Sequence, residues 1–192
     1  MQQGTVQVIC GCMFSGKTEE LVRLLRRAEY ARRRVLLIRP AIDTRTSEVA
    51  LSRAGSSWPS TSVEDPREIL DLAAGDGAEI VAIDEAQFFD ERIVPVVDAL
   101  AAAGRQVIVL GLDLDFLGRP FGSMPALMAS ADEVRKLTAI CLVCGEPATR
   151  TQRLVDGRPA RPDEPLVSIG GMEPGVEKYE ARCRQHHYVP VV

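Results

Sequence analysis

Four short apolar runs in the first 111 residues predict the strands of one sheet. Each run is four to six residues long and rich in Val, Ile and Leu. None shows the apolar–polar alternation of a strand that has one face in water. Uninterrupted runs of this kind are typical of parallel strands buried on both faces. The predicted strands span Val6–Cys10, Val35–Ile38, Glu79–Ile83 and Gln106–Gly111.

Segments with helical periodicity separate these runs. A helix is predicted over 17–34, and a second begins at Asp65, where an N-cap acid, a proline and a capping-box glutamate lead toward Gly75. A third ends at Gly104, and Pro95 must lie in its first turn or kink it. The apolar stripe of the first helix consists of Leu21, Leu24, Leu25 and Ala28. That of the third helix consists of Ile93, Val96, Val97 and Leu100.

Strands that alternate with helices predict an α/β fold of the P-loop NTPase-like kind, a parallel sheet flanked by helices. Ligands of such sheets bind beyond the carboxyl ends of the strands. The segment after Cys10, the pair Asp84-Glu85 and Asp113 all follow predicted strands. We therefore expect them to converge at one edge of the sheet.

The character of the chain changes near Thr138. Helical periodicity disappears, and proline, glycine and arginine become frequent. We predict two domains, an α/β nucleotide-binding domain over 1–137 and a small C-terminal zinc-ribbon or lasso domain over 138–192. Within the second, the composition of 150–176 predicts a long, mobile loop.

Composition and charge narrow the function classes. The net charge is −4 and the sequence pI is about 5.3. The chain therefore lacks the excess of basic residues that is typical of proteins that bind nucleic acid nonspecifically. No apolar stretch approaches a membrane span, and the N-terminus has no charged signal-peptide region. We expect a cytoplasmic protein with no membrane or nucleic-acid partner, whose five cysteines are metal ligands or free thiols. The absence of asparagine removes the guanine clamp of GTPases and the catalytic-loop Asn of protein kinases.

Residues 11–18 read Gly-Cys-Met-Phe-Ser-Gly-Lys-Thr, a complete phosphate-binding P-loop between a predicted strand and helix. Its backbone N–H groups and the positive end of the helix dipole suit the α- and β-phosphates of a nucleotide. Lys17 is expected to reach the β- and γ-phosphates, and the Thr18 hydroxyl to hold Mg²⁺. The predicted nucleotide-binding residues of this loop are Gly11, Cys12, Met13, Phe14, Ser15, Gly16, Lys17 and Thr18.

A second phosphate-chemistry element is the apolar strand that ends in Asp84-Glu85, the Walker B arrangement. Asp84 is placed to hold Mg²⁺ opposite Thr18. Glu85 is then the candidate general base, because phosphoryl transfer requires an acceptor for the proton of the attacking hydroxyl or water. The alternative is an acid pair that caps the next loop and has no chemical role.

Two close pairs, Cys141-x-x-Cys144 and Cys183-x-x-His186, are separated by 38 residues. This is the pattern of a structural zinc site. A redox Cys-x-x-Cys and unrelated buried thiols are the alternatives. His186 fits the spacing better than His187, which could substitute for it. Cys10 and Cys12 are expected to be free thiols.

These elements together resemble the zinc-containing (type II) thymidine kinases. The resemblance covers nearly the whole chain in the order of the family's motifs. It rests on 13–18, Asp84-Glu-Ala-Gln-Phe-Phe89, Gly111-Leu-Asp-Leu-Asp-Phe116, Arg119-Pro-Phe-Gly122, Lys136-Leu-Thr138, both metal-ligand pairs and Tyr179.

The resemblance implies transfer of the ATP γ-phosphoryl group to the 5′-hydroxyl of thymidine, or of deoxyuridine, with Glu85 as the base. It adds Gln87 to the nucleotide-site signature and implies a homotetramer. It also implies a lasso-like loop that holds the pyrimidine. The implied substrate-binding residues are Phe88, Leu112, Phe116, Phe121, Thr151, Ser168, Ile169, Gly170 and Tyr179.

Two other functions fit the motifs taken alone. One is a P-loop ATPase, or a kinase for another small hydroxyl compound. The other is a nucleic-acid-binding regulator that uses its zinc ribbon, against which the acidic pI argues.

Overall fold

The computed structural model describes residues 4–42, 49–51, 57–166 and 177–191. Its centre is a sheet of six strands in the order β5-β2-β6-β7-β1-β8, in which every neighbouring pair is parallel. The predicted fold class is confirmed. The strands span β1 Thr5–Cys10, β2 Val35–Pro40, β5 Thr61–Val63, β6 Ile80–Ile83, β7 Gln106–Gly111 and β8 Glu133–Lys136. A hairpin of β3 Val49–Leu51 and β4 Ser57–Pro59 precedes β5.

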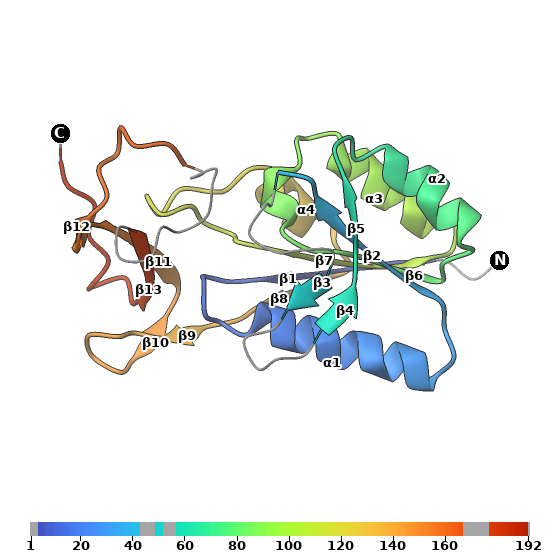
Figure 1. The fold of residues 1–192 in the computed structure, drawn as a ribbon, viewed down its shortest axis with the longest axis horizontal. Coiled ribbons are helices and arrows are strands. Elements are labelled where there is room, and N and C mark those ends of the chain that lie inside the picture. The colour runs from blue at the N-terminus through green and yellow to red at the C-terminus, as the bar shows by residue number, and fades with distance from the viewer. Residues whose placement is uncertain (1–3, 43–48, 52–56, 167–176, 192) are drawn as a thin grey trace.

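Helices cover both faces of the sheet (Figure 1). Helix α1 Lys17–Tyr30 covers one face, and α2 Glu68–Gly75, α3 Ile93–Ala102 and α4 Met124–Ser130 cover the other. Successive strand residues enter opposite cores, as the two-residue strand repeat requires. Ile108 and Leu110 pack with α1, whereas Val107 and Val109 pack with α2 and α3.

The predicted helices are present, but their ends differ. The first helix ends at Tyr30 rather than at 34, because Arg32 takes a positive φ of 55° and turns the chain into β2. The second begins at Glu68, after a turn in which the Glu68 side chain accepts the Asp65 N–H at 2.9 Å, as in a capping box. Pro95 lies in the first turn of α3, as predicted. Neither α4 nor β8 was predicted.

The C-terminal residues form small sheets rather than one long loop. Strands β9 Ala139–Ile140 and β10 Pro147–Ala148 pair with each other, and β11 Arg150–Val155 pairs with β12 Arg158–Pro159 and with β13 Glu177–Arg182. The prediction of a mobile loop over 150–176 is therefore wrong for 150–159. Composition misled it, because the polar residues of β11 are buried and hydrogen-bonded. Residues 167–176 lie outside the described part.

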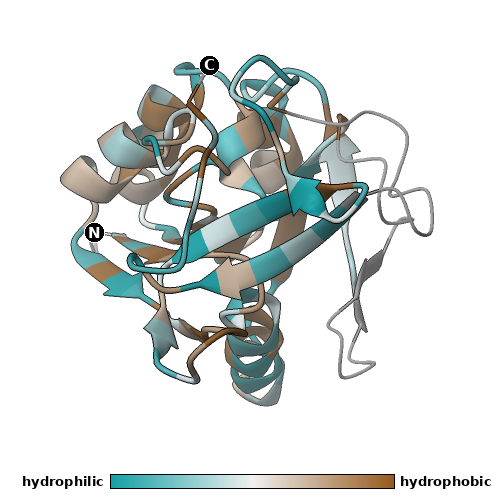
Figure 2. Ribbon diagram, turned by 90° about the vertical axis from the view of Figure 1, so that its left-hand side faces the viewer, coloured by the Kyte–Doolittle hydropathy of each residue, from teal (hydrophilic) through white to brown (hydrophobic). Residues whose placement is uncertain are grey.

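The C-terminal strands lie beyond the carboxyl ends of the parallel strands (Figure 1). Viewed from that end, β11 and β13 are mostly hydrophilic and stand in front of the apolar core (Figure 2). A cluster of small buried residues, Cys12, Ala139, Cys141, Ala148 and Ala181, joins them to the P-loop. The boundary at 137/138 stays a prediction. In the described ranges, no helix is long and apolar enough to cross a membrane.

Candidate active site

The P-loop connects β1 to α1 through a backbone that only certain residues tolerate. Gly11 and Gly16 have φ values of 144° and 83°, and Phe14 has a φ of 68°. A Cβ on Gly11 would lie 2.4 Å from the Leu137 carbonyl oxygen, so the loop can pass β8 only with glycine there. Lys17 Nζ donates to the carbonyl oxygens of Gly11 at 3.0 Å and Cys12 at 2.9 Å, which holds the loop closed around its side chain.

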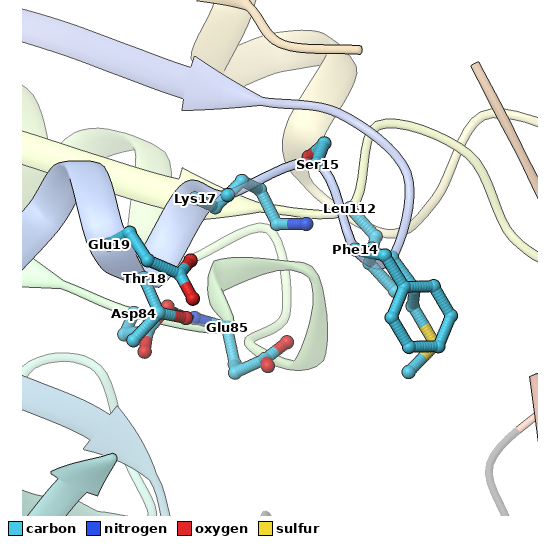
Figure 3. Close-up of a pocket in the computed structure, with 10 residues that line it drawn as sticks. Phe14, Ser15, Lys17, Thr18, Glu19, Asp84, Glu85 and Leu112 are labelled. Atoms are coloured by element: carbon cyan, nitrogen blue, oxygen red, sulfur yellow. Dashed lines mark hydrogen bonds between the residues drawn. The ribbon is translucent and has the colours of Figure 1, made fainter. Parts of the chain in front are cut away.

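A cavity of about 370 Å³ opens beside this loop. Figure 3 shows the Lys17 amine and the carboxylates of Asp84 and Glu85 turned toward the same space, with the Phe14 ring at its far side. Residues that follow β1, β6 and β7 therefore meet at the carboxyl edge of the sheet, as predicted. The lining consists of Met13, Phe14, Ser15, Gly16, Lys17, Thr18, Glu19, Asp84, Glu85 and Leu112.

Asp84 and Glu85 differ in burial and in backbone. Asp84 is buried and its backbone N–H continues the sheet to the Ile38 carbonyl at 2.9 Å. Its Oδ1 accepts the Glu85 N–H at 3.0 Å. Burial raises the pKa of Asp84, the charge of Glu85 raises it further, and Arg39 and Lys17 oppose both effects. Glu85 has a left-handed φ of 53°, a strained backbone that turns its side chain into the cavity.

Gln87 lies behind Glu85 and not in the cavity wall. It follows Glu85 in the short 3₁₀ helix η1 Ala86–Phe88 and is buried. Its Nε2 donates to Glu85 Oε2 at 2.5 Å, and its Oε1 accepts the Leu112 N–H at 3.0 Å. Gly122 makes room for this segment, since a Cβ there would lie 2.2 Å from the Gln87 carbonyl oxygen. Gln87 thus fixes Glu85 relative to the end of β7.

Replacing Gln87 by leucine is expected to destabilise the fold by about 1–3 kcal/mol, because the Leu112 N–H loses its acceptor. It should also lower kcat, since Glu85 loses the bond that orients it. Urea unfolding and steady-state kinetics measure the two effects. Gln106→Leu is the matched control: Gln106 begins β7 at the opposite end, where its Oε1 accepts Arg33 at 2.8 Å. A Gln87 variant with unchanged kcat would contradict the orienting role.

Of the aromatic residues expected around the nucleoside base, Phe116 and Phe121 lie in the segment after β7, and Phe88 ends η1. Phe88 and Phe121 make an edge-to-face contact, with centroids 5.7 Å apart. Phe116 is buried beneath the Arg153 guanidinium, which lies 5.2 Å from its ring centroid. These two contacts join η1, the segment after β7 and β11 into one region, in which Leu112 lines the cavity.

The structure places three of the other expected substrate residues near this region. Leu112 lines the cavity itself. Thr151 is buried in β11, and its Oγ1 accepts the Met13 N–H at 3.0 Å. Tyr179 lies in β13, opposite Arg153 of β11. Ser168, Ile169 and Gly170 lie outside the described residues.

The four expected metal ligands come together. The ligand atoms of Cys141, Cys144, Cys183 and His186 all lie within 4.8 Å of one another. The Sγ atoms of Cys144 and Cys183 are 3.8 Å apart, and His186 Nδ1 lies 3.2 Å and 3.8 Å from the Sγ atoms of Cys183 and Cys141. Zn–S and Zn–N bonds of about 2.3 and 2.0 Å give tetrahedral edges of roughly 3.5–3.8 Å. The donor set therefore fits zinc.

His187 has a different partner from His186. Its Nε2 lies 2.9 Å from the Phe116 carbonyl oxygen. The ring therefore connects the segment after β7 to the C-terminal module, by which we mean strands β9 to β13 and the turns that follow them. Of the two histidines, His186 is the one in the cluster. The other two cysteines, Cys10 and Cys12, are free thiols as expected, and burial raises the pKa of Cys10 to about 11.

Three contacts of the site were missed from the sequence. Arg153 packs on Phe116, His187 bonds its carbonyl, and Lys136 pairs with the buried Asp113 at 2.5 Å. Each joins residues far apart in the chain, and none lies within a single short motif. Residues 150–155, Arg-Thr-Gln-Arg-Leu-Val, show no apolar–polar alternation, so the hydropathy pattern gave no strand signal for β11.

Comparison with known proteins agrees with this geometry. A family model described as thymidine kinase matches residues 4–187. A curated protein of Coprothermobacter proteolyticus named thymidine kinase is 57% identical over 190 residues, which cover 98% of this chain and 93% of that protein.

Proposed function

The chain belongs to the thymidine kinase family, and from that premise we propose how its residues carry out the reaction. It is an enzyme that phosphorylates thymidine with ATP, a function that the family match and the close relative support. A P-loop ATPase and a zinc-ribbon regulator are not favoured. We assign the roles of these residues from one observation: the P-loop and Glu85 line the same cavity.

We assign the phosphate side of this cavity to ATP. The P-loop backbone cradles the phosphates, and Lys17 compensates their charge. The hydroxyl of Thr18 and the carboxylate of Asp84 are hard oxygen donors of the kind Mg²⁺ takes, and they would hold it. Mg²⁺, when bound, would supply neutralisation of the phosphate charge.

Glu85 acts on the nucleoside. Its carboxylate accepts the proton of the thymidine 5′-hydroxyl as that oxygen bonds to the γ-phosphorus. The bond between the γ-phosphorus and the bridging oxygen breaks, and ADP leaves with the electron pair. Gln87 orients Glu85 for this step through the bond to Oε2.

The nucleoside base is assigned to the region between the cavity and the C-terminal strands. Aromatic and apolar walls there exclude water from the reacting groups. Deoxyuridine, which has the same hydrogen-bonding edge, is a second substrate. The assigned residues are Phe88, Leu112, Phe116, Phe121, Thr151, Ser168, Ile169, Gly170 and Tyr179.

Cys141, Cys144, Cys183 and His186 would hold a structural Zn²⁺ that fixes the strands carrying part of this pocket. The product, a deoxynucleoside monophosphate, fits pyrimidine salvage for DNA synthesis in the cytoplasm. Assembly as a homotetramer stays a prediction that rests on the family resemblance, and the cytoplasmic location stays the expectation drawn from the sequence.

The test is transfer of label from [γ-³²P]ATP to a panel of nucleosides. We expect selective labelling of thymidine, weaker labelling of deoxyuridine, and none of purine nucleosides. Hydrolysis of ATP without labelled nucleoside would remove the proposed roles at the base pocket and leave only the phosphate-binding role of residues 11–18.

A further inference from the structure

Two consecutive P-loop residues are bonded to the C-terminal module. The Met13 N–H donates to Thr151 Oγ1 at 3.0 Å, across 138 residues of sequence. The Cys12 thiol donates to the Ala148 carbonyl oxygen at 3.4 Å, across 136 residues. The strands that bear these acceptors lie at the end of the sheet where the P-loop turns (Figure 1). The phosphate loop is thus seated on the C-terminal strands.

One peptide unit carries both the contact to Thr151 and a contact to Lys17. The Cys12 carbonyl and the Met13 N–H belong to the same planar peptide. The carbonyl accepts Lys17 Nζ at 2.9 Å, and the N–H on its opposite side donates to Thr151. Because the group is planar, fixing the N–H also fixes the direction of the carbonyl that contacts Lys17.

Thr151 is itself held rigidly. The residue is only 3% exposed, and β11 pairs it with Ala181 of β13. The next residue, Gln152, exchanges two hydrogen bonds with the Tyr188 backbone, at 2.9 and 2.8 Å. The hydroxyl therefore offers the loop a fixed acceptor rather than a mobile surface group.

We propose that Thr151 is a positioning residue for the phosphate loop, in addition to its place in the base pocket. Its hydroxyl sets the Cys12–Met13 peptide and, through that peptide, the ammonium of Lys17 that meets the ATP phosphates. The strand that contributes to the nucleoside site thereby also shapes the ATP site. This inference rests on the proposed function, in which residues 11–18 bind ATP.

The test separates the hydroxyl of Thr151 from its methyl group. Thr151→Val keeps the shape and removes the acceptor, whereas Thr151→Ser keeps the acceptor and removes the methyl group. Thr149→Val is the control, since the Thr149 hydroxyl contacts Arg150 at 3.4 Å and not the loop. The dissociation constant of a fluorescent ATP analogue is measured without nucleoside, and KM for thymidine is measured separately.

We expect Thr151→Val to weaken binding of the ATP analogue by roughly 3- to 10-fold, the change produced by loss of one hydrogen bond. Thr151→Ser should bind it like the wild type, even where its KM for thymidine rises. Equal binding of the analogue by wild type and Thr151→Val would overturn the inference, and the proposed kinase function would still stand. Failure of the proposed function is a separate result, a wild type that does not label thymidine.

Hydrogen exchange of the Met13 amide in the wild type provides a second test that needs no variant. An amide bonded to a buried hydroxyl exchanges slowly, and we expect protection at least as strong as at the ends of β1. Exchange of the Met13 amide at the rate of an exposed loop amide would overturn the inference even if Thr151→Val did not fold.

Discussion

Replacing Glu85 by glutamine is expected to lower kcat for thymidine phosphorylation by roughly 10²–10⁴, with ATP affinity near that of the wild type. This is the usual contribution of a general base. The amide has nearly the same shape and keeps an oxygen that can accept the Gln87 bond, now 2.5 Å long. It cannot take the proton of the 5′-hydroxyl at neutral pH, so the chemical step alone should suffer.

Glu91→Gln is the matched control for this variant. Glu91 is an exposed glutamate at the turn before α3, six residues further along the chain, and the change removes the same charge. Single-turnover transfer to thymidine and equilibrium binding of ATP are measured for both variants. A Glu85 variant that turns over at near the wild-type rate would remove Glu85 as the base and leave it a role in holding the segment after β6.

The sequence predicted the core of the fold well because apolar burial has a regular local pattern. The strand over 106–111 was predicted with its observed bounds, and the stripe of α3 faces the sheet as expected. Strand β8 carried no such signal. Its four residues are all exposed, so their hydropathy shows no pattern of burial. They form a strand only because they pair with β1.

The residues of the site also fall into those that a local sequence pattern predicts and those that it does not. Phosphate-loop, carboxylate and metal-ligand residues form short motifs, because each chemistry needs its groups at fixed spacing. Contacts such as Met13–Thr151 join residues that are far apart in the sequence. No motif with fixed spacing predicts such contacts. In β11 the polar Thr151, Gln152 and Arg153 are buried with partners, so hydropathy predicted a loop where hydrogen bonds make a strand.

Removal of zinc is expected to lower thymidine phosphorylation by roughly 100-fold or more and to leave the central sheet folded. The four ligands come from the turn between β9 and β10 and from the turn after β13. Without the metal, few apolar contacts hold these turns together, because the local cluster consists of small residues such as Ala139, Ala148 and Ala181. Zinc binding would therefore supply much of the folding free energy of this module.

The loss should reach both substrates, because β11 and β13 carry residues of both sites. Tyr179 and Thr151 are assigned to the nucleoside, and Thr151 also holds the Met13 N–H. Displacement of a positioning group by about 1 Å can cost 10²-fold in rate. The parallel sheet has one apolar core on each face. Its strands and helices should therefore stay folded without the metal.

Metal analysis, circular dichroism and limited proteolysis together test this prediction. Purified wild type should hold about one zinc per chain, and Cys144→Ser should hold much less. Cys10→Ala is the control, since Cys10 lies in β1 outside the cluster and its loss should leave the zinc content unchanged. After chelation we expect cleavage within 138–192, while the helical signal of α1 to α4 persists. Metal-free protein that still phosphorylates thymidine at the wild-type rate would show that the cluster does not support the active site.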